Sequence, residues 1–222
     1  MIVRRTAFAV IFLLACSMCA FATAQIPDKL IYKGETHFLH SNPLEVYFDK
    51  FPEKRPKGGV MSSALWRGYV ATFELKDGEL ILNDVEIQYS AKNESGSHAF
   101  AWKSVLEDVV PKGEVLKIDW FTGILVVPRG KVVNYVHMGY ASTYETYTLI
   151  EIEKGMFRKS RDFDHKAYDA FKARQFEAFK KTEDYKKLVA DIKKDDPDAT
   201  DEFIDSFLRI YVVSYSSKIL VD

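Results

Sequence analysis

The sequence over about Ile31–Glu153 is divided by turn residues about every eight to twelve positions, and this spacing constrains the fold more than any other feature. Segments of that length, rich in aromatic and β-branched side chains, are typical of antiparallel strands rather than of alternating strands and helices. Asp77-Gly78 separates the clearest pair, Trp66–Leu75 and Leu80–Tyr89, and predicts a tight hairpin. The apolar residues of the second arm change parity near Asn83-Asp84, which predicts a bulge.

The pattern changes after KGMFRKSRDFD (residues 154–164), where apolar positions follow a helical spacing. Asp164 is a suitable N-cap for one long helix over about His165–Lys194. We expect a shorter helix over Asp201–Leu208, a final strand in Tyr211–Leu220 and a further helix within Ala99–Val110. The predicted fold class is therefore α+β: a mainly antiparallel curved sheet or partial barrel with a long C-terminal helix, a shorter helix and a final strand.

Residues 1–24 have the three regions of a secretory signal peptide. Arg4 and Arg5 supply the positive start, Thr6–Ala22 is an uncharged apolar run, and Ala22-Thr23-Ala24 provides small residues before a cleavage site. The apolar run is short for a membrane span. We therefore expect an exported protein, periplasmic or secreted, with a signal peptide over 1–24, a β-rich domain over 25–155 and a helical region over 156–222 packed on the sheet.

Cys16 offers an alternative, because Leu13-Leu14-Ala15-Cys16 is similar to the cleavage site of a lipoprotein. The apolar run continues beyond Cys16 to Ala22, however, which favours cleavage after Ala24. Cys16 and Cys19 are the only two cysteines of the chain. After removal of the signal peptide the protein would have neither a disulfide nor a thiol nucleophile.

Charge and motifs argue against several classes of function. The formal net charge of −1 gives no basis for a nucleic-acid partner, and no later segment approaches the length of a membrane span. The chain has no G-x-S-x-G, P-loop or G-x-G-x-x-G sequence. His37 and His40 would point to opposite faces of a strand, so they predict no shared metal. We expect no metal or cofactor, and a small molecule or an envelope protein as partner.

His137 is the candidate for acid–base chemistry. On a strand over Val132–Met138, the favoured interpretation is a buried imidazole bonded inside the sheet. In the alternative, His137 acts as a general base that Glu145 or Asp119 orients, with a tyrosine hydroxyl nearby. The spacing of these residues is not diagnostic of a catalytic triad.

Trp66 and Arg67 form a second candidate site, because an indole and a guanidinium suit an anion or a sugar ring. The alternative interpretation is a core Trp66 and an Arg67 that pairs with Glu74 or Asp119. Ligand pockets combine aromatic area with a few polar groups. On that basis we expect the ligand-binding residues to be Trp66, Arg67, Trp120, Tyr140 and Tyr144.

Three segments resemble signature segments of a family of uncharacterised bacterial proteins, in which similar sequences occur in the same order. They are LWRGYVATFEL (Leu65–Leu75), DWFTGILVVPRG (Asp119–Gly130) and VHMGYASTYE (Val136–Glu145). The resemblance spans about Ile31–Gly155 and implies that the β-rich part is one unit. It implies no activity, ligand or catalytic residue.

These patterns together predict an exported, non-catalytic protein of the cell envelope that binds a small ligand or a protein partner. The alternative is a metal-independent hydrolase that uses His137 with Glu145 or Asp119. The two predictions differ in what surrounds His137, which has to meet a carboxylate and solvent in the hydrolase.

Overall fold

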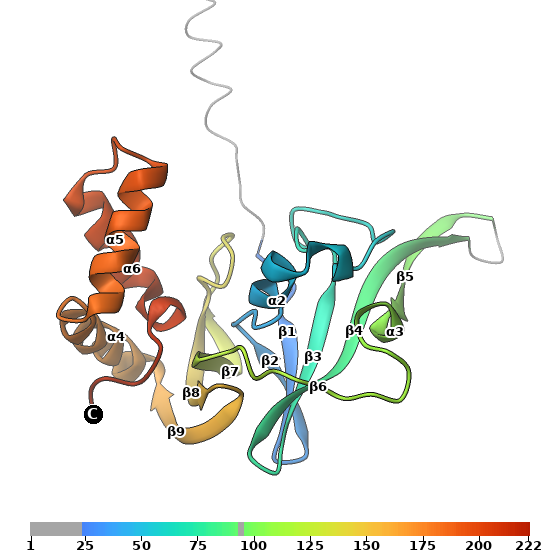
Figure 1. The fold of residues 1–222 in the computed structure, drawn as a ribbon, viewed down its shortest axis with the longest axis horizontal. Helices are drawn as coiled ribbons and strands as arrows, with labels where there is room; N and C mark the ends of the chain where they lie inside the picture. The colour runs from blue at the N-terminus through green and yellow to red at the C-terminus, as the bar shows by residue number, and fades with distance from the viewer. Residues whose placement is uncertain (1–23, 93–95) are drawn as a thin grey trace, which may run out of the picture.

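A computed structural model describes residues 24–92 and 96–222, and its largest element is one curved, mixed sheet (Figure 1). Nine strands of the described chain form this sheet, in the order β2-β1-β3-β4-β9-β8-β7, with β5 and β6 paired to β4. β1 and β3 pair in parallel, and the other strand pairs are antiparallel. The predicted α+β class with a mainly antiparallel curved sheet is confirmed.

The strands are β1 (Asp28–Tyr32), β2 (Glu35–Leu39), β3 (Val70–Lys76), β4 (Glu79–Lys92), β5 (His98–Ser104), β6 (Leu116–Lys117), β7 (Gly123–Asn134), β8 (Thr143–Glu153) and β9 (Met156–Asp164). The helices are α2 (Glu45–Lys50), the 3₁₀ helix η1 (Pro52–Lys54), α3 (Leu106–Val109), α4 (His165–Phe179), α5 (Glu183–Asp195) and α6 (Asp201–Tyr215). The last three helices form a group on one side of the sheet, where α4 contacts β8 and β9 and α6 contacts β7 (Figure 1).

Three tight hairpins, β1–β2, β3–β4 and β8–β9, each turn on two residues with positive φ. The turn residues are Lys33-Gly34 (54° and 82°), Asp77-Gly78 (50° and 83°) and Lys154-Gly155 (48° and 76°). Positive φ at both positions gives a turn whose twist matches that of the flanking strands. The hairpin predicted at Asp77-Gly78 is therefore confirmed.

The bulge predicted near Asn83-Asp84 is also confirmed. Thr72 of β3 pairs with Asp84, whereas the next residue, Phe73, pairs with Leu82, so Asn83 is the extra residue. The apolar residues on both sides of the bulge consequently face the same core, which contains Leu80, Leu82, Val85 and Ile87.

Gly155→Ala is expected to lower the free energy of unfolding by about 2 kcal/mol. Gly155 has a φ of +76°, and a Cβ there would lie 2.9 Å from the carbonyl oxygen of Ile118. Gly78→Ala is the matched control, since Gly78 also has a positive φ but its Cβ would meet nothing within 4 Å. In urea denaturation we expect this control to lose only about 1 kcal/mol. Equal losses in the two variants would contradict a role for the close backbone contact.

β7 and β8 separate two hydrophobic cores, and the first half of β7 and the middle of β8 are buried on both faces. Leu125 and Val127 face the first core, inside the curve of the sheet. Ile124 and Val126 face the second core, which residues of α4 and α6 complete. This double burial explains the unbroken apolar run at the start of β7, since strands covered on both faces need no polar alternation.

The two ends of the sheet, β2 and β7, meet along a short seam beside the second core. The His40 amide donates to the Val126 carbonyl oxygen (2.8 Å), and the Val126 amide donates to the Ser41 hydroxyl (3.1 Å). That hydroxyl in turn donates to the Ile124 carbonyl oxygen (3.2 Å). These bonds satisfy part of the exposed edge of β7 without a strand pairing, so the sheet is curved but is not closed into a barrel.

The stretch expected to form one helix, His165–Lys194, is divided into α4 and α5. The side chain of Thr182 accepts a hydrogen bond from the Tyr185 amide and caps α5. Its hydroxyl also donates to the Phe179 carbonyl oxygen (2.7 Å) at the end of α4. Because apolar residues continue across this break at nearly helical spacing, periodicity alone does not reveal it.

Tyr211–Leu220 does not form the expected final strand, because α6 continues to Tyr215 and an irregular tail follows. Leu208 and Val212 are fully buried one helical turn apart. The β-branched residues Val212 and Val213 favour a strand by propensity, but packing of α6 against α4 outweighs that preference.

Ala99–Val110, expected as a helix, forms most of β5 and the short α3. β5 lies at an edge and pairs with β4 alone, so its apolar side chains are not covered: Phe100 is 65% exposed. Met156–Asp164, expected at the start of the helical region over 156–222, forms β9 and continues the sheet.

The C-terminal tail, residues 216–222, connects the helices to the sheet. The Ile219 amide donates to Oε2 of Glu151 in β8 (2.7 Å). The Leu220 amide donates to Oε1 of Gln175 in α4 (2.9 Å). Arg161 of β9 donates to a carbonyl oxygen of the same tail (3.1 Å). The Ser217 hydroxyl also donates to Oδ2 of Asp184 in α5 (3.3 Å). The tail therefore contacts two strands and two helices.

The predicted signal peptide, including Cys16, lies outside the described residues except for Ala24. Across residues 24–92 and 96–222, no helix is both long enough and apolar enough to cross a membrane. Export of the chain therefore stays a prediction from the sequence.

Candidate functional site

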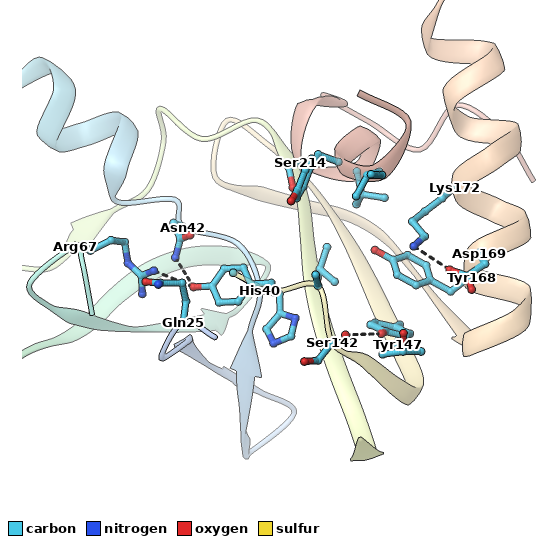
Figure 2. A pocket seen from close by; sticks show the side chains of 18 of the residues that line it. Gln25, His40, Asn42, Arg67, Ser142, Tyr147, Tyr168, Asp169, Lys172 and Ser214 are labelled. Carbon is cyan, nitrogen blue, oxygen red and sulfur yellow. Dashed lines mark hydrogen bonds and ion pairs between the residues drawn. The ribbon is translucent and has the colours of Figure 1, made fainter. Parts of the chain in front are cut away.

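A cavity of about 310 Å³ lies between the β2–β7 seam and the helices α4 and α6. In Figure 2, His40, Asn42 and Arg67 lie on the sheet side of this cavity, and Tyr168 and Lys172 of α4 face them. Aromatic rings make up much of the lining: Trp66, Tyr140, Tyr147, Tyr168 and Tyr211. Segments far apart in the sequence thus build one site, which we call the seam cavity.

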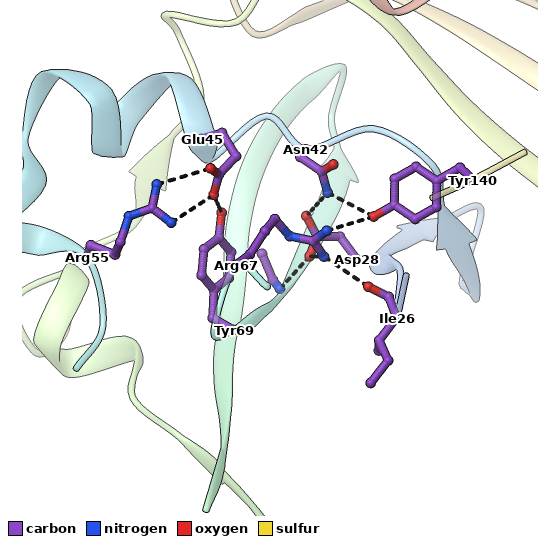
Figure 3. Close-up of polar contacts among 9 residues, drawn as sticks. Ile26, Asp28, Asn42, Glu45, Arg55, Arg67, Tyr69 and Tyr140 are labelled. Atoms are coloured by element: carbon purple, nitrogen blue, oxygen red, sulfur yellow. Dashed lines mark hydrogen bonds and ion pairs between the residues drawn. The ribbon is translucent and has the colours of Figure 1, made fainter. Parts of the chain in front are cut away.

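Asp28 and Arg67 form a buried ion pair behind the seam cavity (Figure 3). Arg67 Nη2 lies 3.2 Å from Asp28 Oδ1, and the two side chains are 1% and 0% exposed. The Ala71 amide and the Asn42 side-chain amide also donate to this carboxylate, at 2.9 and 3.0 Å. Both carboxylate oxygens therefore have donors, as a buried charge requires.

Each member of this ion pair keeps the other one charged. Burial raises the pKa of the Asp28 carboxyl, and the positive charge of Arg67 opposes that rise. Burial alone would lower the pKa of the Arg67 guanidinium, but Asp28 and Tyr140 raise it above its ordinary value. Arg67 consequently remains charged, and its removal would leave Asp28 without a counter-charge.

Tyr140 connects the ion pair to the seam cavity. Its hydroxyl accepts from Arg67 Nη1 (3.0 Å) and from Asn42 Nδ2 (3.1 Å). Burial raises the pKa of this hydroxyl, so Tyr140 is neutral at neutral pH. Its ring lines the cavity, held from behind by the two donors. This arrangement fixes one aromatic wall before any ligand binds.

His40 extends the aromatic wall. Its ring stacks on that of Tyr140, with the centroids 4.5 Å apart and the planes 8° from parallel. Tyr144 meets the same imidazole edge-on at 5.4 Å. Burial lowers the pKa of His40 to about 4. At neutral pH His40 therefore presents an uncharged ring to the cavity.

Lys172 and Asp169 form the charged rim of the seam cavity on α4. Lys172 Nζ lies 2.9 Å from Asp169 Oδ1 and 4.8 Å from the centre of the Tyr168 ring. On the sheet side, Trp66 is 52% exposed and lies in the lining. Lys172 and Asp169 thus neutralise each other at the rim, and Arg67 and Asp28 neutralise each other behind the cavity.

The structure brings together three of the five residues predicted to bind a ligand, which are Trp66, Arg67 and Tyr140. Tyr144 is adjacent, at the edge of the His40 ring. Trp120 lies elsewhere: its indole N–H donates to the Pro43 carbonyl oxygen (3.1 Å), and its ring contacts that of Tyr47. Four of the five residues thus lie in or next to the seam cavity.

The alternative interpretations of Trp66 and Arg67 have different outcomes. Arg67 does pair with a carboxylate, although the partner is Asp28 rather than Glu74 or Asp119. Trp66 is not a core residue, because about half of its surface is exposed. Its indole ring is consequently available at the mouth of the cavity.

His137 lies neither in a strand nor in the interior, so the favoured interpretation of this residue is wrong. β7 ends at Asn134, and His137 is exposed in the following loop, with its Nδ1 3.4 Å from the Tyr135 hydroxyl. The Ser142 hydroxyl accepts from the Val136 amide (3.0 Å) across this loop. These local bonds replace the strand pairing that the apolar alternation predicted.

The structure does not bring His137 together with Glu145 or Asp119. Glu145 Oε2 accepts from the Lys131 amide (3.0 Å). Asp119 lies beside Gly155, at the opposite end of the β7–β8 hairpin from His137. Among the described residues, no hydrogen bond or ion pair joins His137 to either carboxylate.

His37 and His40 lie in different surroundings. His37 Nε2 is 3.7 Å from Glu35 Oε2, whereas His40 stacks inside the seam cavity. In the part of the chain that the structure describes, no cluster of three or more histidine, cysteine, aspartate or glutamate side chains is placed to hold a metal ion.

Sequence reasoning missed Asp28, Asn42 and Lys172. Asp28 alternates in β1 with Leu30 and Tyr32, and all three are buried, so strand parity was a signal that could have placed this carboxylate in the core. Asn42 and Lys172 have no such local signal. They lie in one site only because α4 packs beside the seam.

No protein-family model, no curated protein and no solved structure matches this chain. The resemblance of three segments to a bacterial family therefore stays a prediction, and function has to be inferred from the seam cavity itself.

Proposed function

We propose that the protein is an exported, non-catalytic binding protein of the cell envelope, and that the seam cavity holds a small, uncharged, ring-containing ligand. The observation that carries this proposal is an aromatic cavity in which every charged lining group already has an opposite partner. Export rests on the signal-peptide pattern of residues 1–24.

The balance of charge favours an uncharged ligand. Arg67 is paired with Asp28, Lys172 is paired with Asp169, and His40 is neutral at neutral pH. A charged ligand would lose its hydration on entering the cavity and would find no free counter-charge among these groups. An uncharged ligand loses much less hydration free energy on entering the same cavity.

The shape and chemistry of the lining favour a ring. The stacked pair of Tyr140 and His40 is held rigidly from behind, and the exposed Trp66 adds a second flat surface. Aromatic faces bind aromatic rings and the apolar faces of sugar rings. Asn42 Oδ1 and the Ser214 hydroxyl add polar groups with which a ligand can form hydrogen bonds, while the Asn42 N–H groups already bond to Asp28 and Tyr140.

The contacts of His40 favour binding over catalysis. A hydrolase of the predicted type needs a base within hydrogen-bond reach of a nucleophile or of a carboxylate that orients it. Within the described residues, neither His40 nor His137 has such a bond to a serine or a carboxylate.

A protein partner is the second candidate, and one specific feature supports it. The end of β7 and the loop that follows it expose several apolar side chains close together in sequence, with Val133 50% and Tyr135 55% exposed. Exposed apolar groups of this kind often contact other proteins.

Ser214→Trp tests the ligand proposal. Ser214 is an exposed residue of α6 that lines the seam cavity (Figure 2). An indole at this position would fill the cavity without disturbing a hydrophobic core. Ser206→Trp, at another exposed position of α6 outside the lining, is the matched control. Binding of indole, phenol and methyl β-glucoside would be measured by chemical-shift titration in NMR. We expect at least one of these neutral probes to bind, about tenfold more weakly to Ser214→Trp and unchanged to Ser206→Trp.

Benzoate and benzylammonium, tested in the same titration, separate ring recognition from charge recognition. We expect both to bind about tenfold more weakly than the neutral ring of the same size. Binding of no neutral probe, or equal binding by the charged ones, would overturn the proposed ligand class. Retention of the neutral probes by Ser214→Trp would show that they bind elsewhere.

A further inference from the structure

A second cavity, of about 210 Å³, lies between the β1–β2 turn and the strands β7, β8 and β9. It shares no lining residue with the seam cavity. Its lining is polar and includes Lys33, His37, Arg129, Thr148, Ser160 and Asp162. We call it the turn cavity.

Arg129 is the unusual residue of the turn cavity. Its Nε is fully buried, and no described residue accepts a hydrogen bond from it. The other arginines in the described ranges bond to a carboxylate or to a backbone carbonyl oxygen. Arg129 alone among them forms neither a hydrogen bond nor an ion pair with a described residue. A buried guanidinium donor without an acceptor is costly for the protein by itself.

The nearby carboxylates do not neutralise Arg129. Asp162 lies in the same cavity, but its Oδ1 accepts the Thr148 hydroxyl at 2.5 Å, and no ion pair links it to Arg129. Glu35, at the mouth, is 79% exposed and lies 3.7 Å from His37. Neither carboxylate forms an ion pair with Arg129, so the guanidinium has no partner among the described residues.

Lys33 provides a second cation. The tight β1–β2 turn holds it with a φ of 54°, and its ammonium lies 5.0 Å from the centre of the Tyr32 ring. No ion pair joins Lys33 to a carboxylate of the described chain. A fork-shaped guanidinium, an ammonium and hydroxyl groups around a polar space are the groups that proteins use to bind carboxylates and phosphates.

We propose that the turn cavity is a binding site for a small oxyanion, a phosphate or a carboxylate, which accepts hydrogen bonds from Arg129 and is attracted by Lys33. This site is independent of the ligand proposed for the seam cavity. It supplies the acceptor that Arg129 lacks within the described protein.

Arg129→Gln tests this proposal, because the shorter amide removes the charge and keeps a polar group in the cavity. Arg158→Gln is the matched control on β9, since Arg158 is 51% exposed, pairs with Glu153 and lies outside the cavity. Phosphate and acetate would each be titrated into the protein by isothermal calorimetry, at ionic strength held constant with chloride. Circular dichroism confirms that each variant is folded.

We expect saturable binding of phosphate or of acetate by the native chain, about tenfold weaker in Arg129→Gln and unchanged in Arg158→Gln. The anion that saturates identifies the site as one for phosphate or for carboxylate. If Arg129→Gln does not fold, Lys33→Gln replaces it, with binding expected to weaken about threefold. The proposal would be overturned if neither phosphate nor acetate shows saturable binding. It would also be overturned if the variant that lacks Arg129 or Lys33 binds the anion as tightly as the native chain does. Ser214→Trp should leave this binding unchanged, which separates the two sites.

Discussion

Arg67→Met is expected to lower the free energy of unfolding by about 3–5 kcal/mol. The substitution keeps a similar volume but leaves the Asp28 carboxylate fully buried without its counter-charge. The Tyr140 hydroxyl and the Ile26 carbonyl oxygen would each lose a donor as well. Urea denaturation, followed by far-UV circular dichroism, measures the loss.

Two further variants identify the cause of this effect. Arg55→Met removes a comparable ion pair with Glu45, but that pair is partly exposed, with the two side chains 33% and 22% accessible. We expect it to cost only about 1 kcal/mol. Asp28→Leu combined with Arg67→Met removes both buried charges and should recover a large part of the loss. A loss below about 1 kcal/mol in Arg67→Met would contradict a buried, charged pair.

Acidification from pH 6.5 to pH 4 is expected to remove about 3 kcal/mol of folding stability through His40 alone. Burial lowers the pKa of His40 to about 4 in the folded protein, whereas the unfolded chain titrates near the ordinary value of about 6.5. Between these values the unfolded chain binds a proton that the folded chain excludes. The stabilising effect is therefore complete above pH 6.5 and is lost as the pH falls towards 4.

His40→Phe isolates this contribution, because it removes the titration and keeps a ring that can stack on Tyr140. Denaturation midpoints of both proteins would be measured at several pH values. We expect the stability of the native chain to fall by about 3 kcal/mol more than that of His40→Phe between pH 6.5 and pH 4, since only the native chain has the His40 titration. Parallel curves across this range would contradict a buried, neutral imidazole.

Local signals in the sequence predicted those parts of the fold that short-range chemistry decides. Asp77-Gly78 forms a turn with positive φ at both residues, and Asn83 forms the bulge that the change of parity indicated. Both features depend on backbone conformation within a few residues. The same kind of signal, strand parity, marks Asp28 as an inward-facing carboxylate.

Long-range packing decided the features that the sequence did not reveal. Val212 and Val213 favour a strand by propensity, but they lie in α6 because that helix packs on α4. His137 follows an apolar alternation, yet local bonds in the loop end β7 three residues earlier. For the seam cavity, Trp66 and Tyr140 could be proposed from composition, whereas Lys172 required the position of α4. Neither parity nor helical periodicity carries that information.

The C-terminal tail has a consequence for cooperativity. Its bonds to Glu151 of β8, Arg161 of β9 and Gln175 of α4 connect both layers of the protein. Separation of the helices from the sheet would break these bonds and would expose the second core on both sides simultaneously. We therefore expect the helical group and the sheet to unfold in one transition, in which neither layer loses its structure ahead of the other.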